Sequence, residues 1–197
     1  MSVRRRKPKY LLITGAPGSK WSSVALGIYT SPEVNDSDSS KERTYNKMHA
    51  GAYWDPGMEF ENDEEYWDAP FTKKKAPLTK IIKSHTFAHK LDYLKTLGHP
   101  IILVVRPDIE CFYWWKQAGG LDITYPDYKP YYKTEKRAWK QIKKQNSDIH
   151  EFIYRNNESI TRIKSNTELA EVLALNTNKS KFQEYRKHDI NVYLYSP

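Results

Sequence analysis

The sequence predicts an α/β fold of three layers, in which a mostly parallel β-sheet is flanked by helices. Continuous apolar runs at residues 10–14 and 101–105 lack the polar alternation of a half-exposed strand, which is typical of parallel strands buried on both faces. Residues 78–83 form a further strand candidate, and segments with helix signals separate these runs. Strands that alternate with helices predict a parallel sheet with right-handed crossovers.

The first strand candidate runs into a Gly- and Pro-rich loop at residues 15–20. Ser22 or Ser23 is expected to cap the helix that continues to residue 29, because a hydroxyl can accept hydrogen bonds from the first backbone N–H groups. After the second strand candidate, residues 86–97 have a rough apolar face and are predicted to form one helix.

The strand at residues 101–105 is the clearest in the chain, since it is continuous and rich in β-branched side chains. Pro107 and Asp108 are expected to open the next helix, because proline suits the first turn and an acid suits its positive end. That helix is predicted to stop at residues 119–120, which are both glycine. A Tyr- and Pro-rich loop is predicted to follow at residues 121–133.

Thr134 is expected to cap a basic helix that runs to about Asn146. A fourth short strand is predicted at residues 160–163, and residues 165–168 read as a capping box before another helix. Residues 31–76 are polar, with acidic and aromatic side chains and few apolar runs. They are interpreted as an excursion from the sheet, made of loops with one short helix at most.

Composition indicates one domain over residues 1–197, with a basic tail at residues 1–9. The net charge of +8 favours nucleotides, nucleic acid, anionic sugars or a membrane surface as partners, and fits a merely soluble basic surface equally well.

The single cysteine, Cys111, allows no intrachain disulfide and suits a reducing compartment. The apolar run at residues 10–13 is too short for a signal peptide or a membrane span. A cytoplasmic protein without a membrane partner is therefore expected.

Polar residues follow three of the predicted strands, at residues 14–20, at residues 83–85 and at Arg106. Ligands of open parallel sheets bind at the carboxyl ends of the strands. The sequence therefore predicts a binding site at this edge.

The first of these clusters, residues 14–23 (TGAPGSKWSS), has the composition of a phosphate-binding loop. Small residues let backbone N–H groups approach phosphate oxygens at a positive helix end. The loop adds the ammonium of Lys20 and the hydroxyls of Ser19, Ser22 and Ser23. The Walker A pattern fails at Ser19, which stands for its second glycine, and at Trp21, which separates Lys20 from Ser22. An ordinary strand-to-helix turn with a surface lysine is the alternative interpretation, which the composition of the loop disfavours.

Taken together, the three clusters resemble the sulfotransferase family that uses 3′-phosphoadenosine-5′-phosphosulfate (PAPS). Residues 17–22 resemble its phosphate loop, residues 81–85 its Lys-x-His at a strand end, and residues 101–108 its apolar strand that ends in Arg before a helix. The resemblance implies the three-layer architecture of P-loop NTPase-like sulfotransferases. It also implies transfer of a sulfonate from PAPS to a hydroxyl or amine, leaving the desulfated product PAP.

The resemblance implies a role for each cluster residue. His85 is the expected base, Lys20 stabilises the leaving phosphate, Lys83 lies beside the transferred group and Arg106 holds the 3′-phosphate. The expected nucleotide contacts are the loop residues Pro17, Gly18, Ser19, Lys20, Trp21, Ser22 and Ser23. No metal is required.

Two positions depart from the family pattern. Gly18 stands where the family has a Lys or Arg, and Tyr113 lies near the position of a serine that helps to hold the 3′-phosphate. The hydroxyl of Tyr113 is assigned to that serine's role. The acceptor is expected to be a small molecule or carbohydrate, bound by loops at residues 31–76 and 119–133.

Three alternatives stay open. A P-loop nucleotide or small-molecule kinase would need Mg²⁺ and a working Walker loop. A non-enzymatic nucleic-acid-binding protein rests on the charge alone, and a nucleic-acid partner is therefore not expected. The sulfotransferase fold without its activity is the third.

Overall fold

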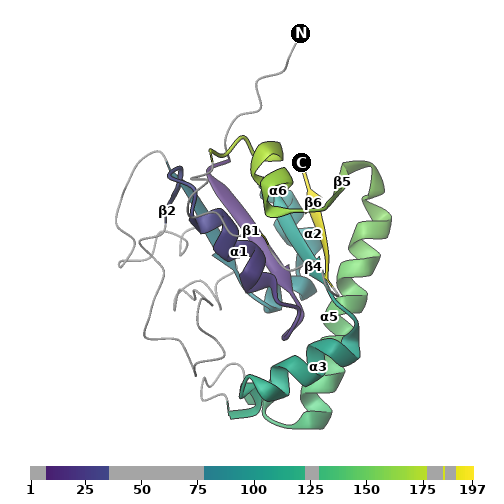
Figure 1. Cartoon of the computed structure of the whole chain (residues 1–197). Helices are drawn as coiled ribbons and strands as arrows, with labels where there is room; N and C mark the ends of the chain where they lie inside the picture. Colours follow the sequence, from purple (N-terminus) through teal and green to yellow (C-terminus); the bar gives the residue numbers. More distant parts are fainter. Residues whose placement is uncertain (1–7, 36–77, 123–128, 177–183, 185–189) are drawn as a thin grey trace.

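The computed structural model describes residues 8–35, 78–122, 129–176, 184 and 190–197. Their strands form one six-stranded sheet of order β2-β3-β1-β4-β6-β5 (Figure 1). The strands, in chain order, are β1 (Tyr10–Gly15), β2 (Val34–Asn35), β3 (Thr79–Lys83), β4 (Ile101–Val105), β5 (Ile160–Ile163) and β6 (Asn191–Tyr195).

The sheet is mixed. Strand β1 pairs in parallel with β3 and β4, and β2 pairs in parallel with β3. Strand β6 runs antiparallel to both of its neighbours, β4 and β5. The α/β class is confirmed, and so is the parallel arrangement of the three strands that carry the polar clusters. Strand β6 departs from the expected pattern.

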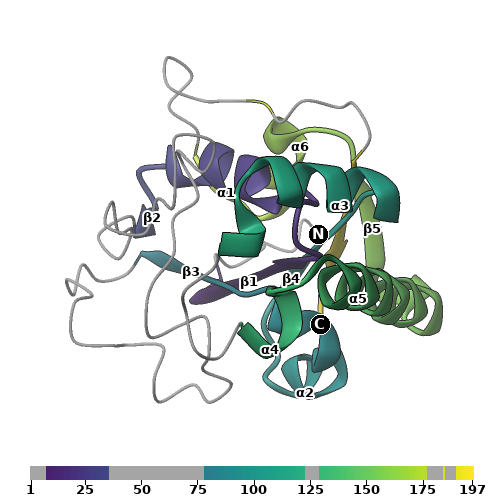
Figure 2. The same cartoon turned by 90° about the horizontal axis from the view of Figure 1, so that it is seen from below.

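Helices cover both faces of the sheet (Figure 2). The α-helices are α1 (Trp21–Tyr29), α2 (Leu91–Thr96), α3 (Asp108–Gln117), α4 (Lys129–Tyr132), α5 (Glu135–Arg155) and α6 (Asn166–Val172). Three short 3₁₀ helices are η4 (Thr86–His89), η5 (Gly120–Asp122) and η6 (Asn157–Ser159). Helices α1 and α6 pack on one face, and η4, α2 and α5 pack on the other. The described elements therefore form three layers.

The two faces of β1 explain its unbroken apolar sequence. Leu11 and Ile13 pack in the cluster beneath α1 and α6, whereas Tyr10 and Leu12 pack in the cluster beneath α2 and α5. Successive side chains of a strand point to opposite faces. Both sets are buried because each face is covered by helices.

Two of the predicted helix starts are confirmed. Thr134 caps α5, with its hydroxyl accepting from the backbone N–H of Arg137. Ser165 caps α6 in the same way, accepting from the N–H of Glu168. Strand β5 matches the predicted fourth strand, and α3 begins directly after Pro107.

Other helix predictions are wrong in detail. The N-cap of α1 is Lys20, whose side chain makes no capping hydrogen bond, and residues 22 and 23 lie inside the helix and not at the predicted cap position. The helix expected at residues 86–97 is divided at Lys90 into η4 and α2. Helix α5 extends far beyond Asn146, to Arg155, because its apolar face continues through Phe152.

The loop predicted at residues 121–133 is partly helical, since it contains the end of η5 and the whole of α4. Strand β2 lies within the segment interpreted as an excursion and belongs to the sheet, so that interpretation is wrong at residues 34–35. Residues 36–77 lie outside the described residues. None of the helices in the described part of the chain combines the length and hydropathy that a bilayer span requires.

Candidate functional site

The three polar clusters meet at one edge of the sheet. Strands β3, β1 and β4 are neighbours and run in parallel, so their carboxyl ends lie side by side. The chain places β2 and β3 on one side of β1 before it crosses to β4 on the other side. The carboxyl end of β1 is therefore the topological switch point, where open α/β sheets bind their ligands.

The loop between β1 and α1 is folded tightly against α3. The N–H of Ser19 donates to the carbonyl of Ala16 at 2.9 Å. Gly18 has φ +82°, and a Cβ at this position would lie 2.0 Å from the carbonyl oxygen of Cys111. Only glycine fits both the backbone conformation and the contact. The requirement for glycine at position 18 therefore has a local steric cause.

The start of α1 is suited to an anion. Its first turn contains no acidic residue and its N-cap, Lys20, makes no side-chain capping hydrogen bond, whereas α2, α3, α5 and α6 each carry an acid in the first turn. Neither an acidic side chain in the first turn nor the side chain of the N-cap residue therefore compensates the positive end of the α1 dipole. The side chain of Ser19 is fully buried there, and its Oγ has no hydrogen-bond partner among the described residues.

Lys20 is held in an unusual conformation at this helix start. Its φ of 63° lies in the left-handed region, which a residue with a Cβ rarely adopts. Its Nζ lies 4.8 Å from the ring centroid of Trp114 on α3. The hydroxyl of Ser23 donates to the carbonyl of Lys20 at 2.7 Å, so this hydroxyl is used within the loop. The side chain of Ser22 lies outside what the structure describes.

His85 follows β3 and contacts the end of β1. Its Nδ1 lies 2.7 Å from the carbonyl oxygen of Gly15 and 3.1 Å from the indole nitrogen of Trp21. These contacts cannot both be hydrogen bonds, because a carbonyl only accepts and an indole N–H only donates. The shorter contact favours the tautomer that carries the proton on Nδ1. Nε2 is then the nitrogen able to accept a proton.

Aromatic rings surround the buried His85. The rings of Trp21, Trp115 and Tyr132 lie edge-on to the imidazole, with centroids at 5.3, 5.8 and 6.4 Å. The hydroxyl of Tyr132 accepts from Nε2 of Gln145 at 2.7 Å, and burial raises the pKa of this phenol above its usual range. Tyr132 and Gln145 were not predicted as site residues, because they come from a segment interpreted as a loop and from a buried helix position.

Arg106 lies between the loop and α3. Its side chain is 5% exposed, and Nη1 donates to the carbonyls of Gly18 and Glu110, both at 3.2 Å. Nη2 donates to the carboxylate of Glu110 at 3.1 Å. The structure therefore brings Arg106 to the loop, as predicted, and also forms the ion pair with Glu110.

Helix α5 fixes the start of α3 behind this site. The side-chain amide of Asn146 donates to the carbonyl of Arg106 at 2.9 Å and to the carboxylate of Asp108 at 2.6 Å. Cys111 is fully buried there, and burial raises its pKa to about 12. The thiol is therefore protonated near neutral pH, which is typical of a structural cysteine.

Two predicted site residues are not brought to the loop by these contacts. The ammonium of the buried Lys83 lies 5.1 Å from the ring centroid of Tyr29, in the last turn of α1, whereas the loop precedes the first turn. Tyr113 is 57% exposed, and it is the next residue, Trp114, that meets Lys20. The proposed roles of Lys83 and Tyr113 stay predictions.

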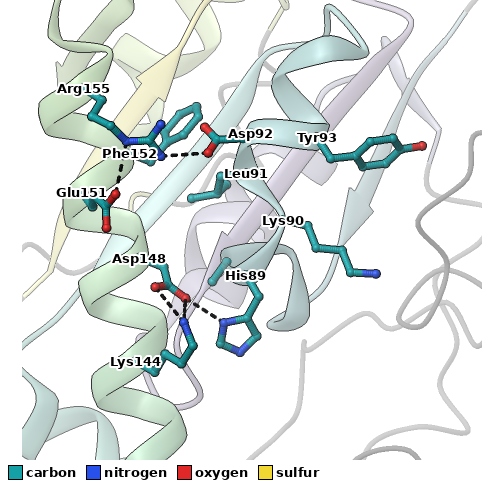
Figure 3. A pocket seen from close by; sticks show the side chains of 11 residues that line it. His89, Lys90, Leu91, Asp92, Tyr93, Lys144, Asp148, Glu151, Phe152 and Arg155 are labelled. Atoms are coloured by element: carbon teal, nitrogen blue, oxygen red, sulfur yellow. Dashed lines mark hydrogen bonds and ion pairs between the residues drawn. The ribbon is translucent and has the colours of Figure 1, made fainter.

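A cavity of about 400 Å³ lies elsewhere, between α2 and α5 (Figure 3). Several of its charged groups pair with one another: Asp148 contacts Lys144 at 2.9 Å and His89 at 2.8 Å, and Arg155 contacts Asp92 at 2.9 Å. His89 thus joins η4 to α5, which separates its role from that of His85. Within the described ranges, no three His, Cys, Asp or Glu side chains gather to hold a metal ion.

Comparison with known proteins identifies no relative, since no family model, no curated protein and no solved structure matches the chain. The chemistry of the site itself must therefore support any functional proposal.

Proposed function

We propose that this protein binds PAPS at the β1–α1 loop and transfers its sulfonate to a hydroxyl or amine of a small-molecule or carbohydrate acceptor. One observation carries the proposal. An uncompensated helix start lies at the switch point of the sheet, with His85 and Arg106 reaching it from the two neighbouring strands.

The residues present fit a ligand with two phosphate groups. The start of α1 and the buried Oγ of Ser19 supply one polar subsite, and Ser19 gains the partner that it lacks among the described residues. Arg106 supplies a second, with a planar fork that suits the oxygens of a phosphate. The two subsites are linked, because Arg106 donates to the loop carbonyl of Gly18.

PAPS, when bound, would supply the sulfonate and a nucleotide leaving group. His85 acts as the base: Nδ1 donates to Gly15, and Nε2 takes the proton of the acceptor hydroxyl as the new O–S bond forms. The electron pair of the broken S–O bond stays on the leaving phosphate. Lys20, beside the loop, then stabilises that charge with its ammonium, which must leave the ring of Trp114.

The kinase alternative is less well supported. A Walker loop needs a lysine followed directly by a serine or threonine whose hydroxyl binds Mg²⁺. Here Trp21 takes that position, and its 5% exposed ring packs in the core beneath α1. Trp21 is therefore a structural part of the helix. No serine or threonine hydroxyl directly follows Lys20, as the binding of Mg²⁺ by a Walker loop requires.

The test is calorimetric titration with PAP in EDTA, beside ATP titrated once in EDTA and once with Mg²⁺. We expect PAP to bind at about micromolar strength without metal, and ATP to bind more than tenfold more weakly. Arg106→Ala should abolish PAP binding, with Arg106→Lys and thermal melting as the control for a folding defect. His85→Gln should retain PAP binding and lose sulfonate transfer. Absence of both heat and thermal stabilisation by PAP would overturn the proposal, and Mg²⁺-dependent ATP binding would favour a kinase.

A further inference from the structure

The guanidinium that the proposed function assigns to a phosphate is already paired with an acid. Nη2 of Arg106 donates to Oε2 of Glu110 at 3.1 Å, four residues along the chain. The two side chains differ in exposure: that of Arg106 is 5% exposed and that of Glu110 is 47% exposed. The pair therefore consists of a fixed cation and an anion at the protein surface.

Only the anion of this pair is free to leave without disturbing the fold. Arg106 also donates to the backbone carbonyls of Gly18 and Glu110, which hold the guanidinium in place. The carboxylate of Glu110 extends from the first turn of α3 into solvent. A half-exposed ion pair contributes little to stability, so displacing this carboxylate costs little.

We propose that Glu110 is a specificity-determining residue, whose carboxylate occupies Arg106 until the second phosphate of a bisphosphorylated nucleotide displaces it. The inference rests on the proposed function, because it concerns the same site. A phosphate monoester carries close to two negative charges and outcompetes one carboxylate for a guanidinium. A ribose hydroxyl carries none and leaves Glu110 in place. The residue thereby lowers the affinity for ligands with a 3′-phosphate and leaves the affinity for ordinary mononucleotides unchanged, which sets the ratio between the two.

The experiment compares two ligands that differ only in this phosphate, PAP and AMP, on wild type, Glu110→Gln and Glu151→Gln. The control Glu151 also forms an i,i+4 pair, with Arg155 at 3.4 Å, on the distant part of α5. Both variants remove the same charge. We expect Glu110→Gln to bind PAP about two- to fivefold more tightly, which is the scale of a half-exposed ion pair, with AMP affinity unchanged. Glu151→Gln should leave both affinities unchanged.

The outcomes separate the inference from the proposal on which it rests. Wild-type binding of PAP with equal or weaker binding by a folded Glu110→Gln, checked by thermal melting, would overturn the inference alone. Equal tightening for AMP and PAP would also overturn it, because that is a general effect of charge. Failure of PAP to bind any of the three proteins would overturn the proposed function and the inference together.

Discussion

Helices α1 and α6 each follow a strand of the same sheet, yet their N-termini are treated in opposite ways. The α6 start is capped by Ser165, and the carboxylate of Glu184 accepts from the N–H groups of Asn166 and Thr167 at 2.7 and 3.1 Å. The α1 start has neither a side-chain cap nor an acid in its first turn, and its N-cap, Lys20, is in the left-handed region.

The two helix ends differ in whether the chain itself completes them, and only the α1 end fits the proposed binding site. At α6 the chain supplies its own anion to the positive end of the helix dipole, so that nothing is left for a ligand. At α1 a strained N-cap and a buried hydroxyl without a described partner lower the stability of the free protein. Such costs are typical of sites completed by a ligand.

The largest expected effect on stability follows from adding one methyl group to Gly18, in the loop between β1 and α1. Gly18→Ala should lower the free energy of unfolding by about 3 kcal/mol, because the new Cβ meets the Cys111 carbonyl at 2.0 Å at φ +82°. Gly98→Ala is the matched control, since Gly98 has φ +70° with nothing within 4 Å; it should cost only about 1 kcal/mol. Urea denaturation measures both. Equal losses would mean that α3 does not confine the loop.

Two serine-to-alanine substitutions separate a cap from a binding group. Ser165→Ala should cost about 1 kcal/mol of stability, because it removes the α6 cap. Ser19→Ala should cost nothing or stabilise the free protein slightly, because its buried hydroxyl has no hydrogen bond among the described residues to lose. Thermal melts with and without PAP provide the measurement. A loss at Ser19 as large as that at Ser165 would contradict the comparison.

The smallest effect concerns the two non-glycine residues in the described ranges with positive φ, Lys20 and Ala174. Replacing either by glycine should relieve strain and raise stability by about 0.5–1 kcal/mol. Ala174→Gly, at the end of α6, should leave PAP binding unchanged. Lys20→Gly should weaken it, because the ammonium is lost. Unchanged PAP affinity in both variants, measured by calorimetry, would remove Lys20 from the proposed site.

The sheet edge was predictable from the sequence for a physical reason. Strands β1 and β4 are buried on both faces and therefore read as unbroken apolar runs, and the polar residues that follow them mark where each strand ends. Parallel pairing with β3 then brings these ends together. The proposed chemistry itself was reached through a family resemblance and stays a prediction.

Other parts of the site depend on which face of a helix each side chain lies on, and the ends of the strands do not determine this. Residues three and four apart share a helix face, so Trp114 and Trp115 lie on the side of Cys111, and Tyr113 does not. Tyr132 comes to lie beside His85 through contacts between separate elements, such as its hydrogen bond from Gln145 on α5. The sequence offers no local signal for such contacts.

The sequence of strand β6 (NVYLY) has aliphatic residues at alternate positions, Val192 and Leu194, which is the period of a half-exposed strand. Both of these side chains are fully buried, whereas Asn191 and Tyr193 are partly exposed. The partners of β6 could not be read from that alternation, since they lie far away along the chain.

The position of β6 also constrains the order in which the sheet can assemble. This strand lies between β4 and β5, and it supplies the ladder that attaches β5 to the rest of the described sheet. During synthesis, β1 to β4 can pair as soon as they emerge, whereas β5 must wait for residues 191–195. The late closure of this non-local pairing is expected to be a slow step of folding, during which one edge of β4 stays open to aggregation.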